Sequence, residues 1–364
     1  MDYSQILSQQ FNIKEEYAKN IITLLDDGNT IPFIARYRKE MHGSMDDQLI
    51  REFAEKLEYL RGLDKRRDEI RSLIDAQEKL TDEINLALDK AATLSELEDI
   101  YRPYRPKRKT RASIAKEKGL EPLANDILKQ EKGFDPSKSA VDYIDEEKGV
   151  TSVEDAIQGA MDIIAELVSD NAEIRKRIRN LTNANGVLVS VATDEEKDSV
   201  YKNYYDYKEP VKKIAGHRVL AVNRGEKEGF LKVSVETDSE KPLNSIFRAM
   251  ITDKNQLCSD IIREACTDAY QRLIYPSIER EVRNDLTDTA AENAMKVFAV
   301  NLKQLLMQPP VKGKTVLALD PGYRTGCKTA VVDSTGKVLD TTVIYPTHSD
   351  KKIQESKTDL APPH

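Results

Sequence analysis

Cysteine is scarce in this sequence of 364 residues, which has only three, at positions 258, 266 and 327. An odd number without C-x-x-C spacing argues against a disulfide framework or a zinc site and favours a reducing compartment. The four histidines are scattered, so no histidine–cysteine cluster suggests a metal. We therefore expect no metal, no cofactor and a cytoplasmic location.

Long hydrophobic runs are missing as well. No window approaches the roughly 18 apolar residues that a membrane span needs. The first ten residues, MDYSQILSQQ, lack the basic region followed by an apolar one that marks a signal peptide. Glycine and proline number only 15 and 14, so long disordered linkers are not expected. We expect a protein of two or three domains that does not contact a membrane.

The overall composition is that of a globular protein with much exposed helix, with 39% hydrophobic and 33% charged residues. The formal net charge of -7 argues against a protein that coats nucleic acid indiscriminately. It does not exclude a local basic surface, because charges are screened beyond a Debye length of about 8 Å at physiological salt.

One basic run stands out against this acidic balance, at residues 101–112, YRPYRPKRKTRA. It contains no acid, and its cations and second tyrosine are Arg102, Tyr104, Arg105, Lys107, Arg108, Lys109 and Arg111. Pro103 and Pro106 push the residues before them out of the α region, so we expect an extended or turn-like segment. Such cations can neutralise phosphates, and tyrosines can stack on unpaired bases. The alternative is a loop whose arginines pair with acids of neighbouring helices.

Helical periodicity dominates roughly the first three hundred residues. Near residues 12–40 it predicts a helical hairpin, in which Asn12 caps the first helix, Gly28 ends it and Pro32 begins the second. The second helix exposes Arg36 and Arg38, so the hairpin is either a DNA-reading helix-turn-helix or an ordinary helical pair.

Further signals predict later helices. Ser44 with Asp47 is expected to start a long helix, and Ser95 with Glu98 forms a capping box for a short helix that ends near Arg102. Helices are also expected from Pro122, over 154–168 and over 172–181, and as buried faces over 257–273 and in AENAMKVFAVNLKQLLMQPP.

Two other segments do not show the helical pattern. Tyrosines at 201, 204, 205 and 207 form either a stacking platform or an anchor that fixes a helix on the core. β-type runs at 218–222 and 230–235 flank NRGEKEG and predict a β-hairpin.

In the last part of the chain the pattern of apolar residues is typical of β-strands. TVLAL, at 315–319, predicts a buried strand, and two more strands follow in a meander that needs further partners to be stable. Asp320 ends the first strand, where an acid can hold magnesium as in two-metal nucleases, with Asp333 or Asp340 as a second carboxylate. Gly322 and Gly326 can instead admit a phosphate, or the DPG sequence can be an ordinary turn.

Four blocks of sequence resemble the Tex family of bacterial transcription accessory proteins. They occur in order and span nearly the whole chain, as IPFIARYRKE (31–40), LEDIYRPYRPKRKTRASIAKEKGLEPLA (97–124), GHRVLAVNRGEKEGFLKV (216–233) and LALDPGYRTGCKTAVVD (317–333).

The resemblance implies a mostly helical nucleic-acid-binding protein whose helical region, with a helix-turn-helix element, leads into a YqgF domain of RNase H-like fold. The family's helix-hairpin-helix and S1-type OB-fold parts would follow this chain. Asp320 matches the first acid of the RuvC-like pattern, whose later acids would lie beyond residue 364. In the family the YqgF domain is generally regarded as non-catalytic.

We therefore expect a mainly α fold, with a helical region at 1–215, a β-hairpin with helices at 216–310, and the first strands of an α/β RNase H-like domain at 311–364. The expected function is that of a non-enzymatic transcription accessory factor that binds RNA or DNA through the basic run, Arg36 and Arg38. The alternatives are a RuvC-like magnesium-dependent nuclease using Asp320, and a scaffold that binds polymerase or ribosome components.

Overall fold

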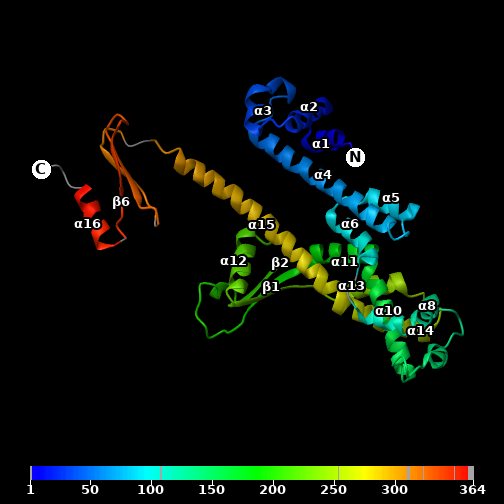
Figure 1. Ribbon diagram of the computed structural model, residues 1–364. Coiled ribbons are helices and arrows are strands. Elements are labelled where there is room, and N and C mark those ends of the chain that lie inside the picture. The colour runs from blue at the N-terminus through cyan, green and yellow to red at the C-terminus, as the bar shows by residue number, and fades with distance from the viewer. Residues whose placement is uncertain are drawn as a thin grey trace. The chain divides into compact units, whose positions relative to one another are not determined.

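The computed structural model describes residues 2–106, 109–252, 254–309, 312–322, 324–347 and 349–359. Its contacts divide the chain into two compact units, unit 1 (Met1–Ala291) and unit 2 (Glu292–His364). Helices dominate the described residues, and the strands form two three-stranded sheets (Figure 1). The mainly α fold class is confirmed, whereas the domain boundaries after residues 215 and 310 stay a prediction.

The first core of unit 1 joins four N-terminal helices, α1 (Tyr3–Phe11), α2 (Glu15–Asp26), α3 (Ile31–Tyr37) and the first half of α4 (Asp47–Asp75). Fully buried Leu7, Ile21, Ile34, Ile50 and Phe53 fill it. A short 3₁₀ turn, η1 (Lys39–Met41), follows α3.

The helix boundaries in this region are partly as predicted. Gly28 ends the turn after α2 with φ 79°, a left-handed value that glycine adopts without strain, and Pro32 lies in the first turn of α3. Asn12 was assigned the wrong role, because it ends α1 in the left-handed conformation and Lys14 precedes α2. Asp46, not Ser44, caps α4, with its carboxylate accepting from the Leu49 amide at 2.8 Å.

A second, smaller core lies between the rest of α4, α5 (Asp82–Lys90) and α6 (Leu94–Tyr101). Thr93 caps α6 by accepting a hydrogen bond from the Glu96 amide, so the capping box predicted at Ser95 and Glu98 is wrong by two residues. Both threonine and serine suit the cap position, and the sequence alone does not decide between neighbours of that kind.

The largest core surrounds the long helix α10 (Val153–Asp170). Around it lie α7 (Arg111–Glu117), α8 (Glu121–Lys129), α9 (Pro136–Ala140), η3 (Val141–Tyr143), α11 (Ala172–Asn185), α13 (Glu240–Met250), α14 (Gln256–Asp268), the π-helical segment η5 (Ala269–Ile274) and the start of α15 (Tyr275–Leu306). Small residues on α10 let α7 and α8 approach closely, since a Cβ at Gly159 would collide with Leu120. The predicted helices from Pro122, over 154–168 and over 172–181 are confirmed as α8, α10 and α11.

The sheet of unit 1 corrects the predicted β-hairpin. β1 (Val187–Ala192) lies between β2 (Asp206–Pro210) and β3 (Leu231–Glu236), and both pairs are antiparallel. The run at 218–222 is not a strand, because it lies within α12 (Gly216–Lys227), whose buried Val219 and Val222 are three residues apart on one helix face. The second predicted strand is confirmed as β3, while β1 and β2 were not predicted.

Unit 2 contains an antiparallel meander of β4 (Val316–Asp320), β5 (Cys327–Val332) and β6 (Val338–Ile344), followed by α16 (Asp350–Asp359). The meander is as predicted. The prediction that its first strand is buried is wrong, because every residue of β4 is exposed and β4 pairs with β5 alone among the described strands. The helix over AENAMKVFAVNLKQLLMQPP belongs to α15, but the predicted buried face is wrong, since Met295, Phe298, Leu305 and Leu306 are all more than half exposed.

Candidate nucleic-acid interface

The basic run connects two helix ends that are firmly fixed. α6 ends at the buried Tyr101, and a 3₁₀ turn, η2 (Arg102–Tyr104), follows it. Arg105 is extended, with φ -67° and ψ 133°. Thr110 then caps α7 in a capping box with Ser113, in which each side chain bonds the other residue's backbone amide at 2.8–3.0 Å. The expected turn-like or extended backbone is therefore found between the two helices, at residues 102–105. The expectation is wrong for Arg102, which keeps α-region values of φ -52° and ψ -43° before Pro103, and for Arg111, which belongs to α7.

Arg102 is largely a structural residue. Its Nε lies 3.3 Å from the Asp170 carboxylate of α10, and its side chain is only 34% exposed. Burial lowers the pKa of the Arg102 guanidinium, and the neighbouring charge of Arg175 lowers it further. Tyr104 is also half-buried, packing against the second core, and its carbonyl accepts a hydrogen bond from Gln77. Neither side chain is freely available to a ligand.

Three cations of the run are exposed. The side chain of Arg105 is 60% exposed and lies 3.3 Å from Glu98, and that of Lys109 is 67% exposed and lies 3.3 Å from Glu117. Arg111, the first residue of α7, is exposed and close enough to Asp162 for its charge to lower the pKa of that carboxyl, against the larger raising effect of burial. Lys107 and Arg108 lie outside the described residues.

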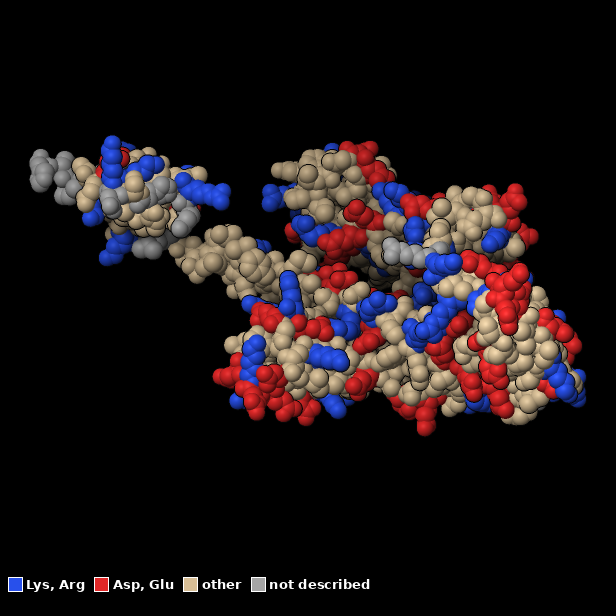
Figure 2. Space-filling view, turned by 60° about the horizontal axis from the view of Figure 1, so that its bottom comes forward, with Lys and Arg blue, Asp and Glu red and all other residues tan. Residues whose placement is uncertain are grey.

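The pairing of these cations matches the alternative that arginines of the run meet acids of nearby helices. Pairs that are so exposed contribute only about 0–1 kcal/mol and exchange readily for other anions. Figure 2 shows basic and acidic side chains interspersed over the face of unit 1 turned to the viewer. The run is thus a local group of cations within a mixed surface, as the acidic total charge requires.

A buried ion network fixes the helix that precedes the run. Asp99 of α6 accepts from Arg175 Nε at 2.5 Å and from Arg179 Nη2 at 2.6 Å, both on α11. Arg179 also donates to Glu281 of α15 at 2.8 Å. All of these side chains are at most 21% exposed. The network ties α6, α11 and α15 together and so holds the start of the basic run in place.

The two arginines predicted on the second helix of the hairpin lie at the end of α3. Arg36 is exposed, and Arg38 is half-buried with its guanidinium 5.3 Å from the ring centroid of Phe33. The ring of Phe33 lies 5.4 Å from that of Tyr37, one helical turn later, and Tyr37 is 63% exposed. The sequence analysis singled out only the two arginines of this helix and missed the aromatic pair, although the i, i+4 spacing of Phe33 and Tyr37 is the signal for it.

The tyrosine-rich segment is an anchor and not an open platform. Tyr201 is buried beneath α12 and β3, and Tyr204 and Tyr205 pack against the same small core. A short 3₁₀ turn, η4 (Lys202–Tyr204), carries Tyr204 and is flanked by Tyr201 and Tyr205. Tyr207 makes an edge-on contact with Tyr204 at 5.2 Å and a hydrogen bond with Glu209.

The acids of unit 2 are dispersed over turns and strand ends. Asp320 is exposed at the end of β4, opposite Lys328 in the register of the sheet. Asp333 closes a turn by accepting from the amides of Thr335 and Lys337 at 2.8 and 3.0 Å. Within the described residues, no three His, Cys, Asp or Glu side chains lie together in a group that could hold a metal ion.

The glycines of the DPGYRTG turn have packing roles. A Cβ at Gly322 would lie 2.6 Å from the Gly326 carbonyl oxygen, and one at Gly326 would lie 2.6 Å from Val343. Gly326 also has φ 86°. Close chain approach and turn geometry therefore account for both glycines without a phosphate.

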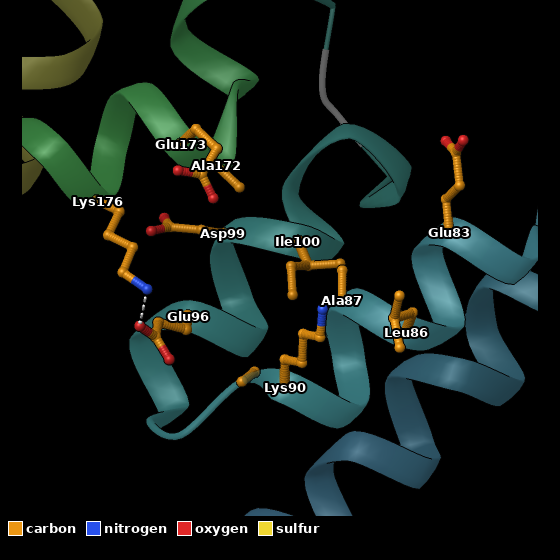
Figure 3. Close-up of a pocket in the computed structure, with 11 residues that line it drawn as sticks. Glu83, Leu86, Ala87, Lys90, Glu96, Asp99, Ile100, Ala172, Glu173 and Lys176 are labelled. Atoms are coloured by element: carbon orange, nitrogen blue, oxygen red, sulfur yellow. Dashed lines mark ion pairs between the residues drawn. The ribbon is translucent and has the colours of Figure 1, made fainter.

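A pocket of about 450 Å³ lies beside the helix that leads into the basic run (Figure 3). Its lining side chains from α5, α6 and α11 combine apolar groups with acids and two lysines, namely Glu83, Leu86, Ala87, Lys90, Ala91, Glu96, Asp99, Ile100, Ala172, Glu173 and Lys176. Lys176 pairs with Glu96 at 2.8 Å. Because Asp99 is compensated by Arg175 and Arg179, and Glu96 by Lys176, only Glu83 and Glu173 give the pocket a small excess of negative charge over Lys90. This small excess disfavours a phosphate ligand and suits a basic, partly apolar peptide better.

Comparison with known proteins gives consistent matches along the chain. Three family models match it, Tex-like protein N-terminal domain over residues 1–75, Tex central region-like over residues 131–298, and Tex protein YqgF-like domain over residues 314–362. Among the described residues, no helix is both long enough and apolar enough to cross a membrane.

Curated relatives cover nearly the whole chain. Uncharacterized protein YdcI of Bacillus subtilis is 46% identical over 98% of this chain and 50% of its own length. Protein tex of Bordetella pertussis is 38% identical over 95% of this chain and 46% of its own. S1 RNA-binding domain-containing protein 1 of Homo sapiens is 32% identical over 94% of this chain and 36% of its own. The chain thus spans about half the length of the bacterial relatives it matches, or less.

Proposed function

Because the chain belongs to the Tex family, we propose that it acts as a transcription accessory factor that binds RNA or DNA without catalysing a reaction on it. Relatives named transcriptional accessory protein Tex and S1 RNA-binding domain-containing protein support the nucleic-acid part of this proposal. A cytoplasmic location, where bacterial transcription takes place, belongs to the same proposal.

The observation that carries the proposal is the position of the exposed cations in the basic run. Arg105, Lys109 and Arg111 project from a segment whose two ends are fixed by Tyr101, the Asp99 network and the capping box at Thr110. A phosphate that approaches them replaces weak, exposed ion pairs and meets side chains already held close together.

Four findings in unit 2 support a non-catalytic role. The carboxylate of Asp333 is engaged in a turn, that of Asp340 accepts from the next backbone amide, and Asp320 stands opposite a lysine in the sheet register. The glycines of the DPG turn are explained by packing. Magnesium-dependent cutting of a branched or RNA–DNA substrate that is lost in Asp320→Asn would contradict this part of the proposal.

A role as a protein-interaction scaffold is the second candidate, and the acidic, partly apolar pocket of unit 1 favours it. Components of the transcription or translation machinery are the partners in that case. The basic run would then meet an acidic protein surface and not a nucleic acid.

The test compares two variants that lose the same positive charge. In one, Arg105, Lys107, Arg108 and Lys109 are changed to Ala, and in the matched control the exposed Lys132, Lys138, Lys148 and Lys241 are changed to Ala. Binding to labelled single-stranded RNA and double-stranded DNA is followed by fluorescence anisotropy. We expect the first variant to bind roughly tenfold or more weakly than wild type and the control to stay close to it.

If the two variants bind the nucleic acids with equal affinity, the basic run is not part of the binding interface. Absence of binding by the wild-type chain would contradict the proposal as a whole and favour the scaffold.

A further inference from the structure

The surface of α3 carries an aromatic pair that its own core does not need. Ile34 is the only buried residue of this helix, and Ile31 and Ala35 complete its contact with the N-terminal core. Phe33 and Tyr37 lie elsewhere on the helix, and Tyr37 leaves 63% of its surface to solvent. A single exposed tyrosine needs no explanation, but a pair of contacting rings with a cation beside it does.

The three groups form a continuous series. Arg38 lies 5.3 Å from the Phe33 ring centroid, and the Phe33 ring lies 5.4 Å from that of Tyr37 at an angle of 42°. The cation and the neighbouring ring limit the side-chain freedom of Phe33 and Tyr37 before any ligand binds. A ligand that stacks on Tyr37 therefore meets a partly preorganised surface.

The charge around this pair differs from that of the basic run. Residues 28–39 include Arg36, Arg38 and Lys39 and no acid, and the exposed Glu40 follows directly after them. In the described part of the chain, no carboxylate forms an ion pair with any of these three cations. Their charge is thus free for an external anion, whereas Arg102, Arg105 and Lys109 each meet an acid.

An exposed tyrosine ring that contacts a half-buried phenylalanine and lies among unpaired cations matches the chemistry of unpaired nucleotides, in which a flat base alternates with a phosphate. Duplex DNA hides its bases in the stack and offers such a ring nothing to contact. An acidic protein surface would satisfy the cations but not the aromatic face.

We propose that Phe33 and Tyr37, with Arg36, Arg38 and Lys39 beside them, form a binding site for single-stranded nucleic acid, in which Tyr37 stacks on a base and the cations contact the flanking phosphates. This inference rests on the proposed nucleic-acid function and deepens it, because it assigns a ligand class and a stacking contact to a second surface of unit 1.

The absence of tryptophan from the sequence makes a specific probe available. In Tyr37→Trp the new indole is the only one in the chain, and stacking on a base quenches its fluorescence. The ligands are a twelve-nucleotide oligouridine and an abasic strand of equal length and charge. Tyr59→Trp is the matched control, because Tyr59 is also exposed, at 44%, with Lys56 4.7 Å from its ring centroid, but lies on α4.

We expect oligouridine to quench Tyr37→Trp and the abasic strand to leave it unchanged, with no quenching of Tyr59→Trp by either. In anisotropy measurements, Tyr37→Ala should bind oligouridine roughly five- to a hundredfold more weakly than wild type and the abasic strand equally well. Tyr37→Phe should retain wild-type binding of both, since its ring is kept.

Other outcomes overturn the inference in distinguishable ways. If wild type binds oligouridine but Tyr37→Trp is not quenched and Tyr37→Ala binds normally, only the stacking site is wrong. The same holds if Tyr37→Ala weakens the two strands equally. If wild type binds neither strand nor duplex DNA, the proposed function fails together with the site.

Discussion

At the scale of single residues, buried charge decides how the basic run is held. Asp99 has a side chain only 6% exposed and compensates two arginines that are 3% and 11% exposed. Removing the carboxylate leaves Arg175 in a poorly hydrated interior without an acidic partner, while Arg179 keeps its pair with Glu281. Leaving a buried charge without its partner is far more destabilising than losing a pair at the surface.

Asp99→Ala should therefore lower the free energy of unfolding by about 3–5 kcal/mol. The matched control is Asp26→Ala, which breaks an Arg61 pair whose side chains are 49% and 41% exposed and should cost less than about 1 kcal/mol. Urea denaturation of the two variants and wild type measures both values. Similar small losses in the two variants would mean that the Asp99 network does not hold α6.

The buried carboxyl of Asp162 on α10 makes the stability of the fold depend on pH. Burial raises the pKa of its carboxyl above the ordinary value of 3.8, although Arg111 and Arg272 act in the opposite direction. A carboxyl with a raised pKa in the folded state is favoured when protonated, so its contribution to stability is lost as the pH rises through the folded pKa.

Asp162→Asn should accordingly gain stability relative to wild type as the pH rises from about 4 to about 7, because the amide carries no charge to bury. Denaturation curves for the two proteins across this range supply the difference at each pH. A difference that stays constant, or that narrows towards neutral pH, would show that ionised Asp162 is well accommodated by Arg111 and Arg272.

At the scale of elements, local signals were predictable and long-range ones were not. Gly28 and Pro32 marked the turn between α2 and α3 correctly, because left-handed backbone and a fixed φ depend on the residue itself. The strand predicted at 218–222 was wrong because the apolar residues there fit both a strand and a helix. Packing against the sheet of unit 1 selects the helix. The Asp99 network joins residues 76 and 80 positions apart, which no local pattern reveals.

Two helical glycines test how packing between helices decides whether a Gly→Ala substitution stabilises or destabilises the protein. Gly62 lies exposed within α4 with open space around the position of a Cβ, so Gly62→Ala should stabilise the protein by about 0.5–1 kcal/mol through helix propensity. Gly159 lies on α10 where a Cβ would collide with the buried Leu120, so Gly159→Ala should be destabilising. Thermal unfolding measures the stability of the two variants relative to wild type. A gain in stability in both variants would mean that α8 and α10 are not closely packed.

At the scale of the whole molecule, an acidic chain carries two separate groups of exposed cations in unit 1. The basic run was visible in the sequence from its composition, but the sequence could only offer ion pairing as an alternative and could not name the partners, Asp170, Glu98 and Glu117. The α3 surface was visible only as two arginines, since the contact between Phe33 and Tyr37 depends on which helix face the core takes. The family itself was predictable from four sequence blocks, because they span nearly the whole chain.

The most direct test of the central claim is the salt dependence of RNA binding by the whole chain. A plot of log affinity against log salt concentration has a slope set by the number of phosphates that the protein neutralises, about 0.7 per contact on a single strand. If the basic run binds nucleic acid, changing Arg105, Lys107, Arg108 and Lys109 to Ala should flatten this slope by roughly 2 to 3 units. An unchanged slope in this variant would contradict the claim that the basic run contacts phosphates.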